Sequence, residues 1–173
     1  LNELEATTVE IAKMHAKSIC GERERRILET LQRINSSAAS CYEQGLMDLL
    51  TPSRRSWRGT IVEFREALRE TLDYLAPDEE IRNSSGFKLD PSAGKPTMSQ
   101  KARFILMSRG LKKGQTEPTE KATLAIEQVF GGIVRSVYDR ASVGVHTTVE
   151  KKEAFRVKEW VTMVLEELLE ARE

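Results

Sequence analysis

Apolar residues recur at helical spacing along almost the whole chain. Between about residues 60 and 75, Ile61, Phe64, Leu68 and Leu72 follow one another at intervals of three and four, the period of a helix with one buried face. The same periodicity predicts helices over about residues 38–50, 97–108, 119–140 and 149–171. No stretch shows the two-residue alternation typical of a half-buried strand. The pattern therefore predicts an all-α protein.

The apolar stripe of the first predicted helix, about residues 2–34, is interrupted by the charged run 21–26, which we interpret as a solvated helix face. Such a stripe is typical of a long exposed helix or of a helix that pairs with another chain. We expect residues 1–50, which hold this long N-terminal helix and the next one, to serve in dimerisation or as a linker. Residues 51–173 are then the helical bundle domain.

Glycine and proline mark the breaks in the pattern. Residues 83–96 form a loop longer than most helix–helix connections, which makes it a candidate functional loop. Pro118 is a good first-turn residue and predicts a helix start there. Gly131 and Gly132 fall inside the helix that follows and indicate a kink or a tight helix crossing.

Composition narrows the range of partners. With 173 residues, 39% of them hydrophobic, the chain can bury the core of one compact domain. Its 27 basic and 27 acidic residues cancel, so a site for RNA or another nucleic acid has to be a local cluster of positive charge.

The sequence has no signal peptide and no apolar run near the roughly 18 residues that a membrane span needs. We therefore expect a cytoplasmic protein that does not bind membranes. Cys20 and Cys41 match neither a metal-binding spacing nor a disulfide framework, so no metal and no cofactor are predicted. A chain that begins at Leu1 rather than Met is typical of a trimmed chain or of a piece of a longer protein.

The candidate chemistry lies in Arg140 and His146, which have five residues between them. A guanidinium can hold a phosphate in a bidentate fork, and an imidazole can move a proton near neutral pH. In an unbroken helix six residues correspond to about 600°, so the two side chains meet only if the helix loosens, for example around Gly144. Arg135 can add a phosphate contact. Other interpretations remain open: Arg140 pairs with a glutamate of the last helix and His146 merely ends its helix, or the two residues contact nucleic acid without catalysis.

A second constellation is the stretch of residues 53–59, where Arg54, Arg55 and Arg58 surround Trp57 just before a helix start. These residue types offer phosphate contacts and a stacking face for nucleic acid. The alternative is that Trp57 packs into the core while the arginines are solvated or cap neighbouring helices. A weaker basic stretch, residues 88–103, contains Lys95, Lys101 and Arg103.

An arginine separated from a histidine by four to six residues, at the end of a helix in a small all-α domain, resembles the HEPN superfamily. This resemblance implies a HEPN-like helical bundle, often a homodimer, and a metal-independent ribonuclease. Arg140 would then neutralise charge on the phosphoryl oxygens, and His146 would act as general acid or base in a reaction that leaves a 2′,3′-cyclic phosphate. Ala141 stands where that superfamily commonly has a polar residue.

A longer resemblance covers about residues 56–169 and points to bacterial proteins described as predicted pPIWI-associating nucleases. It is carried by these segments: Trp57-Arg-Gly-Thr60, Arg65-Glu-Ala-Leu-Arg-Glu70, Leu75-Ala-Pro77, Gly86-Phe-Lys88, Lys95-Pro-Thr-Met98, Gln100-Lys-Ala-Arg-Phe-Ile-Leu106 and Arg140-Ala-Ser-Val-Gly-Val-His146. It implies a place in prokaryotic antiviral defence, with a larger defence protein as a possible partner.

Two classes of function therefore compete. The first is a HEPN-like ribonuclease or a nuclease-associated effector of a prokaryotic defence system. The second is a non-catalytic helical module that dimerises or docks onto a larger protein. The Arg140–His146 spacing favours the first class, and the patchy N-terminal stripe favours the second.

Overall fold

The computed structural model describes residues 14, 20–51, 53–89, 93–143 and 148–170, and for residues 136–143 it describes only the helical backbone. Within these ranges the chain forms helices and no strand, so the predicted all-α fold is confirmed. The helices are α2 (Glu22–Ile34), α3 (Ser36–Leu50), α4 (Arg58–Leu75), α5 (Asp78–Arg82), α6 (Met98–Ser108), α7 (Lys113–Val143) and α8 (Lys151–Leu169).

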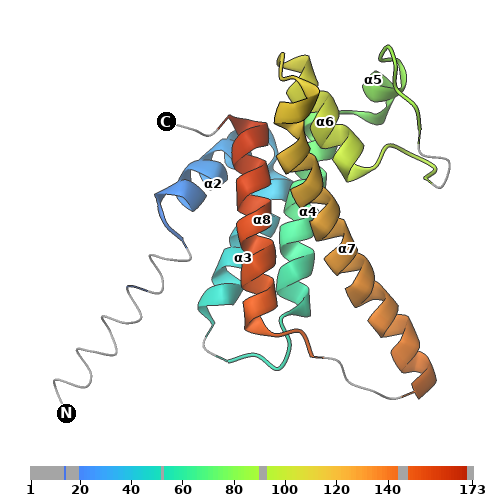
Figure 1. Cartoon of the computed structure of the whole chain (residues 1–173). Helices are drawn as coiled ribbons and strands as arrows, with labels where there is room; N and C mark the ends of the chain where they lie inside the picture. Colours follow the sequence, from blue (N-terminus) through green and yellow to red (C-terminus); the bar gives the residue numbers. More distant parts are fainter. Residues whose placement is uncertain (1–13, 15–19, 52, 90–92, 144–147, 171–173) are drawn as a thin grey trace.

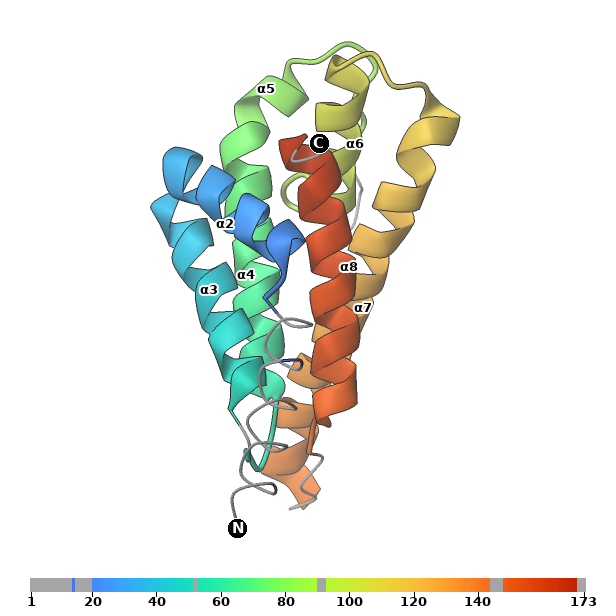
Figure 2. The same cartoon turned by 90° about the vertical axis from the view of Figure 1, so that its left-hand side faces the viewer.

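The helices α4 and α8 run through the centre of the bundle. The helices α2 and α3 pack on one side of this pair, and α6 and α7 pack on the other (Figures 1 and 2). Leu68 and Leu72 of α4 and Val161 and Leu165 of α8 are fully buried, so the two central helices supply much of the core. None of the described helices is both long enough and apolar enough to span a membrane.

Gly45 allows α3 and α4 to cross closely. A Cβ atom at Gly45 would lie 2.8 Å from two ring atoms of Phe64, closer than real Cβ contacts. The Phe64 ring cannot move away easily, because it is fully buried and packs edge-on against Tyr42 with ring centroids 5.8 Å apart. The Tyr42 hydroxyl lies 2.9 Å from Oγ1 of Thr162, which joins α3 to α8. Glycine at this position therefore permits the packing of three helices.

The charged run 21–26 is not simply a solvated face, and that prediction was wrong for Glu24. Glu24 is buried, and its carboxylate accepts a hydrogen bond from the Lys158 ammonium group of α8, which is 1% exposed. Nearby, Arg23 Nε donates to Glu166 Oε2 at 2.9 Å. The charges in this run attach α2 to α8, because a buried charge is tolerated only when it has a partner.

Most of the predicted N-terminal helix lies outside the described residues. Its described part, α2, begins after Gly21, whose backbone N–H donates to Glu24 Oε2 at 3.0 Å. It ends at Asn35, which serves as the N-cap of α3: Asn35 Oδ1 accepts from the backbone N–H of Ala38 at 3.0 Å. Asn35 Nδ2 also donates to the Glu70 carbonyl at 3.2 Å, so the turn between α2 and α3 is fastened to α4.

The helix predicted to start at Pro118 begins five residues earlier, at Lys113. Proline lacks an N–H and is disfavoured in a helix interior, which is why the sequence placed the start there. Local hydrogen bonds stabilise the additional turn: the Lys112 N–H donates to Gln115 Oε1 at 2.9 Å, and Thr116 Oγ1 lies 2.6 Å from Glu120 Oε1. Pro118, which the sequence indicated as the start of a helix, therefore lies inside the first turns of α7.

The Gly131–Gly132 pair does not serve a tight helix crossing. No described atom lies within 4 Å of the position that a Cβ would occupy at Gly132. At Gly131 the nearest group is the Arg135 guanidinium, 3.5 Å away on the same helix. The two glycines leave α7 with an open surface at this point.

Gly132→Ala should therefore stabilise the fold. Alanine is favoured over glycine in a helix by about 1 kcal/mol, and the added methyl group meets none of the described atoms. We expect the free energy of unfolding to rise by about 0.5–1 kcal/mol, measured by urea denaturation followed by circular dichroism. An unchanged or lower value would show that the pair is needed for packing or for a partner.

Candidate nucleic-acid interface

The C-terminal end of α7 positions Arg140. The helix continues to Val143, so the Arg140 backbone lies in its last turn, where the helix dipole favours a positive charge. The Arg140 side chain and the whole of His146 lie outside the described residues. The predicted approach of the two side chains therefore stays a prediction.

A backbone contact joins the two segments that precede α4 and α8. The Trp57 N–H donates to the Val149 carbonyl at 3.1 Å, and Val149 is buried. These segments lie at the end of the bundle where α7 finishes (Figure 1). The arginine-rich segment 53–58 and the start of α8 are thus brought to the same end as Arg140.

Trp57 is part of the core rather than an exposed stacking face. Its side chain is buried, with the residue only 6% exposed. Two cations approach the ring: Cζ of Arg54 lies 5.8 Å from its centroid and Nζ of Lys151 lies 5.0 Å from it. Trp57 thereby gathers positive charge from two separate segments. We refer to Arg54, Arg55, Arg58, Lys151 and Lys152 as the basic end.

Arg54 has a structural partner within the basic end. Its guanidinium pairs with the Asp48 carboxylate of α3, and its NH1 atom lies 3.1 Å from Thr60 Oγ1. Burial alone would raise the pKa of Asp48, but hydrogen bonds from Arg54, Gln44 and Thr60 outweigh it and hold that pKa below its usual value. Arg54 therefore fixes the end of α3 to the start of α4, and its charge is largely compensated.

Arg55 and Lys152 are exposed, as is Arg54, whose charge is compensated by Asp48. Lys152 borders a shallow hollow of about 450 Å³ that also touches Thr148 and Arg156. Two carboxylates line the same hollow, and one of them, Glu153, lies 3.2 Å from the Arg156 guanidinium. The positive charge that a polyanion can contact therefore lies mainly in the segment 53–58, which contains Trp57, and at Lys152.

Arg55→Gln should weaken RNA binding without affecting the fold. One phosphate contact contributes about one unit to the slope of log affinity against log salt, so we expect a shallower slope and a several-fold weaker affinity. The measurement is fluorescence anisotropy with a labelled single-stranded RNA over a range of salt. Arg33→Gln, an exposed arginine at the end of α2, is the matched control. Equal effects of the two substitutions would contradict a role for the basic end.

Arg135 lies on α7, five residues before Arg140. It is exposed, and its guanidinium folds back along α7 towards Gly131, about two turns before the helix ends. The described residues do not bring it together with Arg54, Arg55 or Arg58. Its assignment as a phosphate contact stays a prediction.

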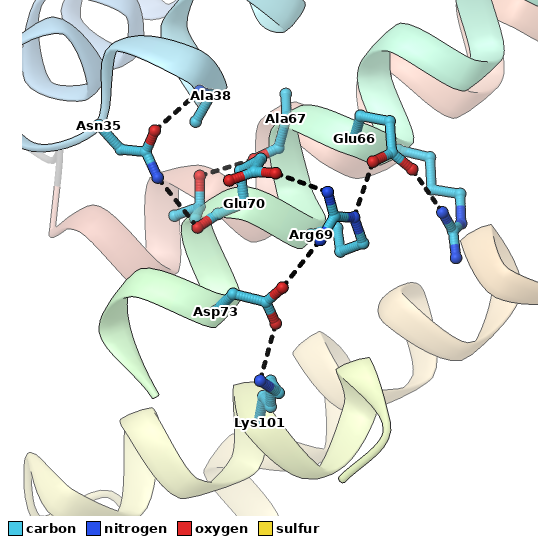
Figure 3. A network of polar contacts seen from close by, with 10 residues as sticks. Asn35, Ala38, Glu66, Ala67, Arg69, Glu70, Asp73 and Lys101 are labelled. Atoms are coloured by element: carbon cyan, nitrogen blue, oxygen red, sulfur yellow. Dashed lines mark hydrogen bonds and ion pairs between the residues drawn. The ribbon is translucent and has the colours of Figure 1, made fainter. Parts of the chain in front are cut away.

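Lys101, from the second basic stretch, has a structural role. It is 4% exposed and donates to Asp73 Oδ1 at 2.7 Å, and its ammonium group lies 2.5 Å from Asp78 Oδ1 of α5. Asp73 also accepts from Arg69, which pairs in addition with Glu66 and Glu70 along α4 (Figure 3). These carboxylates are compensated by cations, and Lys101 joins α6 to α4 and α5. The sequence predicted no helix at 78–82, where it placed only the end of α4.

Two titratable groups stand out elsewhere in the described chain. Burial and nearby carboxylates such as Glu63 raise the pKa of the Cys41 thiol to about 11, so it is protonated at neutral pH and unsuited to attack a substrate. Burial raises the pKa of the Glu127 carboxyl, although a hydrogen bond from the Met98 backbone and the charge of Arg65 act to lower it. Glu127 lies about 20 Å along α7 from Arg140, so it is not part of the same site. No group of metal-ligating side chains occurs in the described ranges.

Sequence reasoning missed Lys151 and Lys152. Both begin α8, and the paired lysines at 151–152 were the available signal. They looked like ordinary surface charges because their neighbour, Trp57, lies 94 positions away in the sequence.

Comparison with known protein families adds evidence on the class of protein, which the geometry alone does not give. A family model described as a predicted pPIWI-associating nuclease matches residues 31–168, which is most of the chain. The chain belongs to this family. The predicted family resemblance is therefore confirmed. Neither a curated protein nor a solved structure matches the chain.

The matched region of this predicted pPIWI-associating nuclease family includes the basic end, all of α7 and the start of α8. It also includes Arg140 and His146. It begins within α2, so α3 is part of what family members share. The family name indicates a nuclease and, with it, contact with nucleic acid.

Proposed function

We propose that this protein is a HEPN-like, metal-independent ribonuclease, or a nuclease-associated effector, of a prokaryotic defence system. The observation that carries the proposal is the position of Arg140 in the last turn of α7, at the same end of the bundle as the basic end. His146 is one of the four residues, 144–147, between Val143 at the end of α7 and Thr148.

In the proposed reaction a ribose 2′-hydroxyl attacks the adjacent phosphorus atom in line. His146 takes the proton from that hydroxyl or gives one to the leaving 5′-oxygen. Arg140 neutralises the charge that grows on the phosphoryl oxygens, and the P–O5′ bond breaks to leave a 2′,3′-cyclic phosphate. One arginine and one histidine make a sparse site, so two copies facing each other in a homodimer are proposed to complete it. The basic end would hold the RNA backbone beside them.

The test is cleavage of a mixed pool of labelled RNAs in EDTA by the purified chain. We expect cleavage with 2′,3′-cyclic phosphate ends, loss of cleavage in Arg140→Ala and His146→Ala, and a dimer in solution by light scattering. Cleavage that persists in both variants would overturn the assignment of these residues. Absence of cleavage by a folded, dimeric wild type, alone or with its defence partner protein, would overturn the ribonuclease proposal.

A second candidate is a non-catalytic helical module for dimerisation or docking, with residues 1–50 as the proposed docking or linker segment. It is favoured by Met47 and Leu50, two exposed apolar residues one turn apart at the end of α3. A wild type without cleavage, whose dimer is disrupted by Met47→Glu, would support this candidate.

A further inference from the structure

A pocket of about 500 Å³ lies between the 83–89 segment and α6, at the opposite end of α7 from Arg140. Its volume is within the range of about 300–1,000 Å³ that is typical of small-molecule sites. It belongs to the loop that the sequence singled out as a candidate functional loop. Neither the basic end nor the proposed cleavage site makes use of it.

Hydrogen bonds hold the walls of this pocket in place. Gly86 adopts a φ of +83°, which glycine permits, and the Phe87 N–H donates to the Ser84 carbonyl at 3.3 Å. Gln100 Nε2 donates to the Lys88 carbonyl at 3.1 Å and so ties the loop to α6. At the far side of the loop, the Arg82 guanidinium donates to the Gly94 carbonyl at 3.0 Å. The pocket is therefore formed in advance of any ligand.

The lining combines an apolar wall with positive charge. Phe87 and Phe104 are half-buried, and Met107 is 47% exposed at the rim. Lys88 and Arg103 also line the pocket, and none of its described lining residues carries a carboxylate. Glu120 Oε1 lies 3.8 Å from Arg103 Nε, too far for a strong hydrogen bond, and the Arg103 side chain is 42% exposed.

This combination suits a flat aromatic group that carries an anion. Aromatic side chains stack on nucleobases whatever their sequence, and cations such as arginine bind phosphate. We propose that this pocket binds a nucleoside phosphate, with its base against Phe87, Phe104 and Met107 and its phosphate at Lys88 and Arg103. The source is either a free nucleotide or an unpaired nucleotide of an RNA strand.

The test is titration of the full chain with AMP, GMP, CMP, UMP and a single-stranded RNA 10-mer, measured by calorimetry. Lys88→Gln combined with Arg103→Gln removes both cations, and Met107→Trp fills the pocket while keeping them. We expect each of these variants to weaken nucleotide binding about tenfold or more. Lys95→Gln changes an exposed lysine of the same loop outside the pocket, and it should bind as the wild type does.

The results also separate the two sources. Tight binding of a mononucleotide that depends on the pocket identifies a free nucleotide, and pocket-dependent binding of the 10-mer alone identifies an RNA strand. The proposal is overturned if neither ligand binds, or if both bind the pocket variants as tightly as the wild type. Because the readout is binding, a failure of RNA cleavage or of His146→Ala leaves this result unaffected.

Discussion

Lys158→Ala is expected to lower the free energy of unfolding by about 3–5 kcal/mol, because it leaves a buried carboxylate without its partner. The Lys158 and Glu24 side chains are only 1% and 6% exposed, and water cannot replace the missing ammonium group. Lys158 also donates to Glu159 Oε1 at 2.8 Å, but Glu159 is half-exposed and tolerates the loss. Urea denaturation followed by circular dichroism measures the effect.

The matched control for Lys158→Ala is Lys152→Ala, an exposed lysine on the same helix, which should change stability by no more than about 0.5 kcal/mol. The double variant Glu24→Leu, Lys158→Met replaces the pair with apolar groups of similar size and should recover much of the stability. It does not recover all of it, because Glu24 also accepts from the Gly21 N–H. Equal stability of Lys158→Ala and Lys152→Ala would contradict the buried ion pair.

His146→Ala is expected to reduce the rate of RNA cleavage by about 10²–10⁴-fold, the usual contribution of a general acid–base group. The chain has two histidines, so His15→Ala is a matched control and should cleave as the wild type does. Cleavage rates are measured under single-turnover conditions in EDTA between pH 5 and 9. A histidine that acts in proton transfer also confers a pH dependence on the wild-type rate, and His146→Ala should remove it.

Arg140→Lys separates charge from geometry at the proposed site. Lysine retains the positive charge but loses the planar fork that grips two phosphoryl oxygens. We expect Arg140→Lys to cleave more slowly than the wild type and faster than Arg140→Ala. A rate for His146→Ala within a few-fold of that of His15→Ala would exclude His146 from catalysis and favour the alternative in which it merely ends its helix.

The helices were predictable from sequence because each buries one face. The apolar residues of that face recur at intervals of three and four along the chain. The predicted start of α4 differs from the observed one by two residues, and its predicted end agrees. Pro118 misled the prediction because proline is favoured in the first turn of a helix, whereas α7 already begins at Lys113 and contains Pro118. The presence of a helix was therefore easier to predict than the residues at which it begins and ends.

The pairing of charges could not be predicted. Glu24 and Lys158 lie 134 residues apart, and Asp48 pairs with an arginine that looked available to phosphate. The sequence of a helix does not show which of its charged residues will be paired, because the pairing depends on how the helices pack. For the same reason the sequence indicated Arg54, Arg55 and Arg58 as a group, whereas in the structure Asp48 compensates the charge of Arg54.

The close crossing at Gly45 has a consequence for how this family can diverge. Any side chain at that position would have to displace the buried Phe64 ring, and with it the contact between Tyr42 and Thr162. A lineage that keeps this arrangement of α3, α4 and α8 can vary Gly132 more readily, since no atom of the described residues lies within 4 Å of a Cβ there. It cannot replace Gly45 unless position 64 becomes smaller at the same time. A paired change at 45 and 64 among distant relatives would therefore record an ancestral shift in how these helices cross.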